Sequence, residues 1–203
     1  MAMTPPEADA TPRERAKADR HDALRHEAAR LFAASGFDGV SLEELGSAVG
    51  ITGPAVYRHF ASKRALLGAI LLRASDDLLA GGRAVVAESA TPDAHLRALV
   101  GFHVEFALAD ADVIRVHDRD LPHLSDGDRH TVRRLQREYV DLWIGVLGLL
   151  HPHRSPDELR VRAHAGFGLL NSTAYSVRAL RDAPADAVIH DALSAMTLAA
   201  LRD

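Results

Sequence analysis

The chain has 203 residues, of which 47% are hydrophobic and 26% are charged, and its formal net charge is −4. These values are ordinary for a globular protein, and the absence of cysteine excludes disulfides and thiolate-ligated metal sites. No apolar run approaches the ~20 residues needed to cross a bilayer, and the first fifteen residues lack the apolar segment of a secretion signal. We therefore expect a soluble, cytoplasmic protein.

Helical periodicity dominates the sequence, and no segment alternates between apolar and polar residues as a strand does. Residues 1–12 are rich in Pro, Ala and Thr, which predicts a disordered tail. The remainder predicts an all-α fold of nine helices, over approximately 13–35, 42–49, 52–59, 63–80, 92–109, 112–121, 126–150, 155–181 and 184–201.

Helix boundaries are marked by start and stop residues. Gly36 is expected to end the first helix in a left-handed conformation. Ser41 with Glu44 three residues later predicts a capping box for the second helix. Thr52 is a candidate cap for the third helix, and Gly81–Gly82 is expected to end or bend the fourth.

Two short helices separated by a turn at Gly50 have the length of a helix-turn-helix, whose second helix enters the DNA major groove. Small residues at its start allow close approach to base edges, and hydroxyl, imidazole and ammonium groups nearby are suited to phosphates. The predicted DNA contacts are Ser41, Thr52, Gly53, Pro54, Ala55, Tyr57, His59 and Lys63.

Several of these residues have a second interpretation. Ser41 and Ser62 are equally well explained as helix caps alone, and Tyr57 as a partly buried core residue. The cations just before and within the first helix, Arg13, Arg15, Lys17 and Arg20, are either a DNA-facing cluster or a solvated charged end.

The segment Gly39–Leu67 resembles the DNA-binding domain of the TetR family of transcriptional regulators. The matching pieces are AASGF at 33–37, VSL at 40–42, LGSAVGI at 45–51 and AVYRHFASK at 55–63. The sequence departs from the family pattern at Arg64–Ala65, where members often carry acidic residues. This replaces a capping glutamate with a cation near a helix N-terminus.

The resemblance implies a division into a DNA-binding domain over 13–61, with its recognition helix at about 52–59, and a ligand-binding and dimerisation domain over 62–203. It also implies a homodimer formed by the last two helices. In that dimer, two recognition helices roughly 34 Å or more apart face a near-palindromic operator. Ala163, Gly166, Leu170, Leu193 and Met196 are among the residues that would pack there or in the monomer core.

A small-molecule pocket needs apolar walls and a few placed polar groups. Three of the later helices offer both on one face, and each of these residues is otherwise explained as core. The predicted effector contacts are Leu99, His103, Phe106, Tyr139, Trp143, His164, Phe167, Asn171 and Tyr175. A largely apolar effector is expected, of a lipid-like, acyl-thioester, aromatic or drug-like class.

The chain has twelve histidines but no HExxH or other ligand spacing typical of a metal site. It also has no serine elbow, phosphate loop or nucleotide fingerprint. We therefore expect no metal, no cofactor and no catalysis, and we expect a ligand-responsive repressor of transcription. The alternative is a helical small-molecule-binding protein without DNA-regulatory activity, which would show no salt-dependent DNA affinity.

Overall fold

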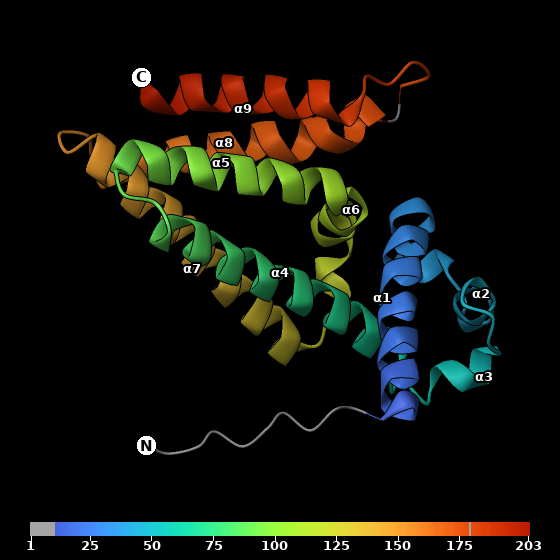
Figure 1. The fold of residues 1–203 in the computed structure, drawn as a ribbon. Helices are drawn as coiled ribbons and strands as arrows, with labels where there is room; N and C mark the ends of the chain where they lie inside the picture. The colour runs from blue at the N-terminus through green and yellow to red at the C-terminus, as the bar shows by residue number, and fades with distance from the viewer. Residues whose placement is uncertain (1–10, 179) are drawn as a thin grey trace.

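The computed structural model describes residues 11–178 and 180–203, and these residues form α-helices and one short 3-10 helix, with no strand (Figure 1). The elements are α1 (Pro12–Gly39), α2 (Leu42–Ala48), α3 (Gly53–Val56), α4 (Lys63–Ala87), α5 (Pro92–Ala109), α6 (Ala111–Asp120), η1 (Leu121–His123), α7 (Asp126–Leu150), α8 (Pro156–Arg178) and α9 (Asp186–Arg202). The all-α prediction is confirmed. A disordered tail was predicted for residues 1–12. Residues 1–10 lie outside the described part of the chain, and Pro12 already belongs to α1.

The first three helices form a separate block beside the remaining bundle (Figure 1). The predicted capping box is present, because the Ser41 hydroxyl accepts from the Glu44 amide and the Glu44 carboxylate accepts from the Ser41 amide. Val40 and Leu45, which flank the cap, are both buried, as expected of a hydrophobic staple. Local sequence therefore sets the start of α2.

The turn between α2 and α3 requires two glycines. Gly50 has φ +71°, a conformation that other residues rarely adopt. A Cβ atom on Gly46 would lie 2.7 Å from the Ile51 carbonyl oxygen and 2.8 Å from the Thr52 carbonyl carbon. The backbone of the turn therefore packs directly on the backbone of α2, which fixes the position of α3.

Helix α1 is broken near its end and is held there by α6. Gly36 has the predicted positive φ, +81°, but its ψ of 158° lies outside the left-handed helical region, in a region open almost only to glycine. Beside it, the Arg119 guanidinium donates to the carbonyl oxygens of Phe32 and Ala33 and to both oxygens of the buried Asp120 carboxylate. Helix α6 thereby holds the end of α1.

Two apolar cores are present, and α4 contributes to both. Its first turns place Leu66, Leu67, Ile70 and Leu71 in a core with α1, α2 and α3. Leu79, further along α4, belongs to the core formed with α5, α7, α8 and α9. The apolar packing therefore crosses the boundary predicted between residues 61 and 62.

Gly81–Gly82 does not end α4, since the helix continues to Ala87. Both glycines instead make room for aromatic rings. A Cβ on Gly81 would lie 2.3 Å from Phe102, and one on Gly82 would lie 2.6 Å from Tyr139. The close approach of α5 and α7 to α4 explains why glycine is tolerated inside this helix.

Helices α8 and α9 stack on the outer side of α5 (Figure 1). Among the described residues, they carry three of the six exposed large apolar side chains, Val161, Val188 and Met196. Our assignment of interface residues is corrected here, because Ala163, Gly166, Leu170 and Leu193 are buried within the single chain. The exposed faces are instead defined by residues spaced three and four apart. They are Val161, Ala165, Gly168 and Ser172 on α8, and Val188, Ala192, Ala195 and Ala199 on α9, with Met196 also exposed.

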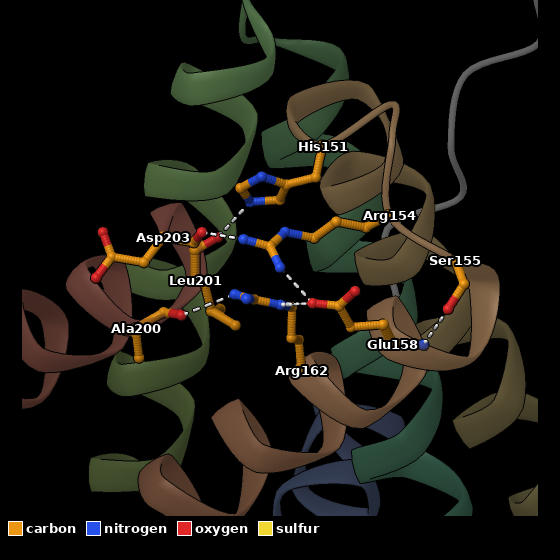
Figure 2. A network of polar contacts seen from close by, with 8 residues as sticks. All are labelled: His151, Arg154, Ser155, Glu158, Arg162, Ala200, Leu201 and Asp203. Atoms are coloured by element: carbon orange, nitrogen blue, oxygen red, sulfur yellow. Dashed lines mark hydrogen bonds and ion pairs between the residues drawn. The ribbon is translucent and has the colours of Figure 1, made fainter.

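Figure 2 shows how the C-terminal end of α9 is held. His151 Nε2 lies 2.7 Å from the Leu201 carbonyl oxygen, Arg162 donates to the Ala200 carbonyl and Arg154 to the Asp203 carbonyl. Glu158 accepts from both arginines. Basic groups are favourable at a helix C-terminus, where the last carbonyls lack intrahelical partners. This network positions α9 on the start of α8.

Replacement of Gly46 by Ala tests the close packing of the helix-turn-helix. The added methyl group would meet backbone atoms that cannot move separately, so we expect a loss of about 1–3 kcal/mol in the free energy of unfolding. Gly145→Ala is the matched control, because the space around Gly145 in α7 is open. Urea denaturation should show destabilisation only for Gly46→Ala, and an equally stable Gly46→Ala protein would contradict the packing described.

Candidate DNA interface and effector cavity

The recognition segment is shorter than predicted but exposes the expected first turn. Helix α3 proper spans Gly53–Val56, and hydrogen-bonded turns continue to Phe60. Thr52 is the N-cap residue, yet its hydroxyl makes no capping bond, contrary to our interpretation of it as a side-chain cap. Thr52 and Pro54 are exposed, and Ala55 is half-buried. Tyr57 is 55% exposed, so the interpretation of Tyr57 as a core residue is wrong.

Gly53 is not accessible to DNA, and this predicted contact is corrected. The residue is buried, and a Cβ atom there would lie 3.1–3.3 Å from atoms of Glu43 on α2. Gly53 therefore allows α3 to pack closely on α2, and not, as predicted, to approach a DNA base. The position needs glycine for packing, and the sequence pattern alone does not distinguish the two reasons for a small residue.

Lys63 has interaction partners within the protein that sequence reasoning missed. Its ammonium donates to the carbonyl oxygens of Phe37 (2.7 Å) and Val40 (2.9 Å) and lies 4.5 Å from the centroid of the Phe37 ring. Two of its three N–H groups are thus used inside the protein. Lys63 ties the end of α1 to the start of α4, and its phosphate role stays a prediction that rests on the third N–H.

Positive charge gathers around the recognition segment. Burial lowers the pKa of His59, and the neighbouring cationic groups His21, Lys17, Arg20 and Arg58 lower it further. Lys17, Arg20 and Arg58 are exposed. The side chain of Arg13 lies outside the described part of the chain. This local field suits a polyanion even though the chain as a whole is acidic.

The bundle contains a cavity of about 570 Å³ that opens between α7 and α8, with a smaller chamber of about 80 Å³ at its inner end. The two share His103, Tyr139 and Asn171 in their walls. The inner chamber is lined by apolar side chains, Leu71, Ala74, Leu78, Phe106, Val113 and Ile114, and also by the polar side chains of Ser75, His117, Asp118 and Gln136. Cavities of several hundred cubic ångströms are typical of small-molecule sites.

Most of the predicted effector contacts lie in this wall. His103, Phe106, Tyr139, His164, Phe167 and Asn171 line the cavity or its inner chamber. Leu99 and Trp143 do not, because both are fully buried in the apolar core behind it. The predicted contact at Tyr175 has a side chain outside those that the structure describes.

His103 is the polar centre of the cavity. It is 2% exposed, its Nδ1 lies 3.1 Å from the Tyr139 hydroxyl, and its Nε2 lies 2.9 Å from Asn171 Oδ1. The rings of Trp143 and Phe167 pack around it at centroid distances of 5.9 and 5.2 Å. Burial lowers the pKa of His103 to about 4, against the hydrogen bond to Asn171, which raises it. The imidazole is therefore neutral at physiological pH.

Sequence reasoning missed the charged mouth of the cavity. Arg133 and Arg137, one turn apart on α7, line the opening, with Arg160 on α8 opposite and the carboxylates of Asp118 and Asp141 nearby. The signal in the sequence was a run of arginines at 129, 133 and 137, which share one helix face.

The arginines of α7 divide into two groups. Arg129 pairs with Asp126, and Arg134 pairs with Glu138. Among the described residues, neither Arg133 nor Arg137 has a carboxylate within ion-pair distance. The two arginines that face the cavity are therefore the ones available to an anion.

His103 makes the stability of the protein depend on pH in a defined window. The unfolded chain binds a proton at His103 below pH 6.5, and the folded protein does so only below about pH 4. The free energy of unfolding therefore decreases as the pH falls through this window. In His103→Gln, its decrease between pH 7.5 and pH 5 should be smaller than in the native protein by about 2 kcal/mol. Urea denaturation at the two pH values measures this, with the exposed His130→Gln as control. An unchanged pH dependence in His103→Gln would contradict the burial of a neutral imidazole.

No helix in the described ranges has the length and apolar character to cross a membrane, and no group of three or more potential metal ligands occurs there.

The architecture and the sequence match those of known proteins. Residues 24–70 match the family described as "Bacterial regulatory proteins, tetR family", and residues 89–175 match "Tetracyclin repressor-like, C-terminal domain".

The chain is 34% identical over 146 residues to the HTH-type transcriptional repressor KstR2 of Rhodococcus jostii, covering 71% of this chain and 70% of that protein. A TetR-family regulator from Bordetella parapertussis superposes with a TM-score of 0.80 at 25% identity, over 90% of this chain and 94% of that one. The regulator AibR, solved with isovaleryl coenzyme A and operator DNA, superposes with a TM-score of 0.71 at 22% identity, over 87% and 97%. The chain belongs to the TetR family of transcriptional regulators, and it is a DNA-binding protein rather than an enzyme.

Proposed function

We propose that this chain is a cytoplasmic repressor that leaves its operator when a short-chain coenzyme A thioester enters the cavity between α7 and α8. The observation that carries the effector class is the cavity mouth, where Arg133 and Arg137 face the opening with no carboxylate partner among the described residues. Guanidinium groups are suited to phosphates, and an acyl-coenzyme A carries phosphates towards one end and an acyl thioester at the other.

The inner chamber fits the other end of such a molecule. Its apolar walls suit a hydrocarbon group, and its volume of about 80 Å³ suits a short acyl chain rather than a long one. AibR, which shares this fold, was solved with isovaleryl coenzyme A. The charge and the size of this cavity, taken together, favour the same class of ligand here.

DNA recognition is proposed to rest on the first turn of α3 and the cations beside it. Thr52, Pro54 and Tyr57 are exposed, and Lys17 and Arg58 add positive charge. The hydroxyls of Thr52 and Tyr57 suit phosphate oxygens or base edges. Ser41 has its hydroxyl bound within the cap, where it remains compatible with a phosphate at the N-terminus of α2.

Dimerisation is proposed to use the exposed stripes of α8 and α9 defined above. Their small residues allow two helices to approach closely, and Val161, Val188 and Met196 supply exposed apolar area. A two-fold dimer of this kind presents two α3 segments to the two halves of a near-palindromic operator.

Replacing Thr52 and Tyr57 together by Ala tests the DNA contacts. We expect operator affinity to fall at least tenfold, since lost base or phosphate contacts cost about 1–3 kcal/mol each. Fluorescence anisotropy with a duplex from upstream of the gene measures this at fixed salt. Glu105→Ala, on the exposed side of α5, is the control. Unchanged affinity in the double variant would refute the assignment, and a lack of salt-dependent binding by the native chain would favour the alternative of a small-molecule-binding protein.

Replacing Arg133 and Arg137 together by Gln tests the effector class. We expect isovaleryl coenzyme A to bind at least tenfold more weakly, because two phosphate partners are lost, while DNA affinity without ligand is unchanged. The matched control is Arg129→Gln with Arg134→Gln, which removes the same charge from paired arginines of the same helix. Calorimetric titration that shows equal losses in both double variants would mean that general charge, not this mouth, attracts the ligand.

A further inference from the structure

His103 lies where α5, α7 and α8 meet, and both of its ring nitrogens have partners on the other two helices. Nδ1 faces the Tyr139 hydroxyl, and Nε2 faces Asn171 Oδ1. A neutral imidazole carries a single proton, so one nitrogen donates and the other accepts. The direction of the whole chain of hydrogen bonds therefore depends on where that proton lies.

The partner atoms determine the position of the proton. Asn171 Oδ1 can only accept, so Nε2 holds the proton and donates. Nδ1 must then accept from the Tyr139 hydroxyl. Burial raises the pKa of Tyr139, which keeps its proton in place for donation. Donation thus runs in one direction, from Tyr139 through His103 to the oxygen of Asn171.

This direction decides what Asn171 offers to the cavity. With its oxygen occupied by His103, the remaining polar group of the side chain is the amide nitrogen, which has two N–H donors. Asn171 is half-buried and lines both the cavity and the inner chamber. No acceptor for its nitrogen is found among the described residues.

We propose that the Asn171 amide nitrogen donates to an acceptor oxygen of the effector, and that Asn171 is the residue that selects a carbonyl-bearing ligand. This inference rests on the proposed effector cavity. It adds the requirement that the ligand carries an acceptor oxygen near its inner end. The thioester carbonyl lies between the phosphates and the acyl chain. Asn171 likewise belongs to both the outer cavity with its arginines and the apolar chamber.

Selection follows from the cost of leaving a donor unpaired. A ligand without the oxygen would displace water from Asn171 and offer no acceptor in return. Sites built to hydrogen-bond one group discriminate strongly against analogues that lack it. We expect discrimination of about tenfold or more, because Asn171 is only half-buried.

The first test needs no effector. In the 15N-labelled full-length protein at pH 7, the nitrogen chemical shifts of His103 should show a neutral ring protonated at Nε2. Asn171→Asp, which keeps the acceptor oxygen, should retain that tautomer. A His103 ring protonated at Nδ1 in the native protein would reverse the amide of Asn171 and overturn the proposal.

The second test compares isovaleryl coenzyme A with S-(3-methylbutyl) coenzyme A, a thioether of the same length that lacks the carbonyl oxygen. Calorimetric titration of the full-length native protein should show the thioester binding about tenfold more tightly. Asn171→Leu should reduce this ratio to within about twofold by weakening the thioester alone. Glu105→Ala, at an exposed position on α5, should keep the native ratio.

The possible failures are distinct. If both compounds bind and the native ratio is near one, or if Asn171→Leu keeps a tenfold ratio, the selection by Asn171 is refuted while the effector class stands. If neither compound binds, the coenzyme A effector is refuted, and the tautomer of His103 decides whether Asn171 presents a donor. If Asn171→Leu does not fold, Asn171→Asp replaces it and should weaken the thioester more than the thioether, because its carboxylate repels the carbonyl oxygen.

Discussion

The Arg119 guanidinium joins the two halves of this molecule. It donates to the Phe32 and Ala33 carbonyls on α1 and to the buried Asp120 carboxylate on its own helix, α6. The hydrogen bond to Asp120 raises the pKa of Arg119, so the cation is permanent. The two residues that precede Arg119 in α6, His117 and Asp118, line the cavity. Four consecutive residues of α6 thus connect the effector cavity to the end of α1.

The packing of α6 supports the same connection. Val116 lies in the core around the helix-turn-helix, whereas Ile114 lies in the core of the effector domain. A ligand shifts DNA affinity only if it binds one arrangement of the protein more tightly than the other. Because α6 belongs to both cores, displacement of its cavity face would also displace α1. The Gly36 break leaves the end of α1 dependent on this contact rather than on its own helix.

The cavity separates its charges from its interior. Arginines stand at the exposed mouth, whereas the buried polar centre is a neutral imidazole between a phenol and an amide. A buried charge would carry a large desolvation cost, which a neutral hydrogen-bonded group avoids. The buried His103 group therefore provides directional hydrogen bonds without net charge, suited to an uncharged part of a ligand.

The sequence by itself determined the local features of this protein. The all-α class, the capping box at Ser41, the positive φ of Gly36 and the cap at Ser62 were all predictable, because each depends on residues within one or two turns. The residue pattern around Tyr57 likewise indicated the family, since recognition helices are short and locally encoded. Most cavity-lining residues were also found, because apolar faces with a few polar groups follow helical spacing.

The tertiary structure decided which neighbour each of these residues has. Gly53 and Gly81–Gly82 are small because another helix lies against them, and Lys63 is bound by carbonyls 23 and 26 residues away in the chain. Leu99 and Trp143 are core rather than cavity. Of the residues assigned to the dimer interface or the monomer core, Ala163, Gly166, Leu170 and Leu193 are buried within the chain, and Met196 is exposed. Helical periodicity shows that residues share a face, but only long-range packing decides whether that face meets a helix, a cavity or solvent.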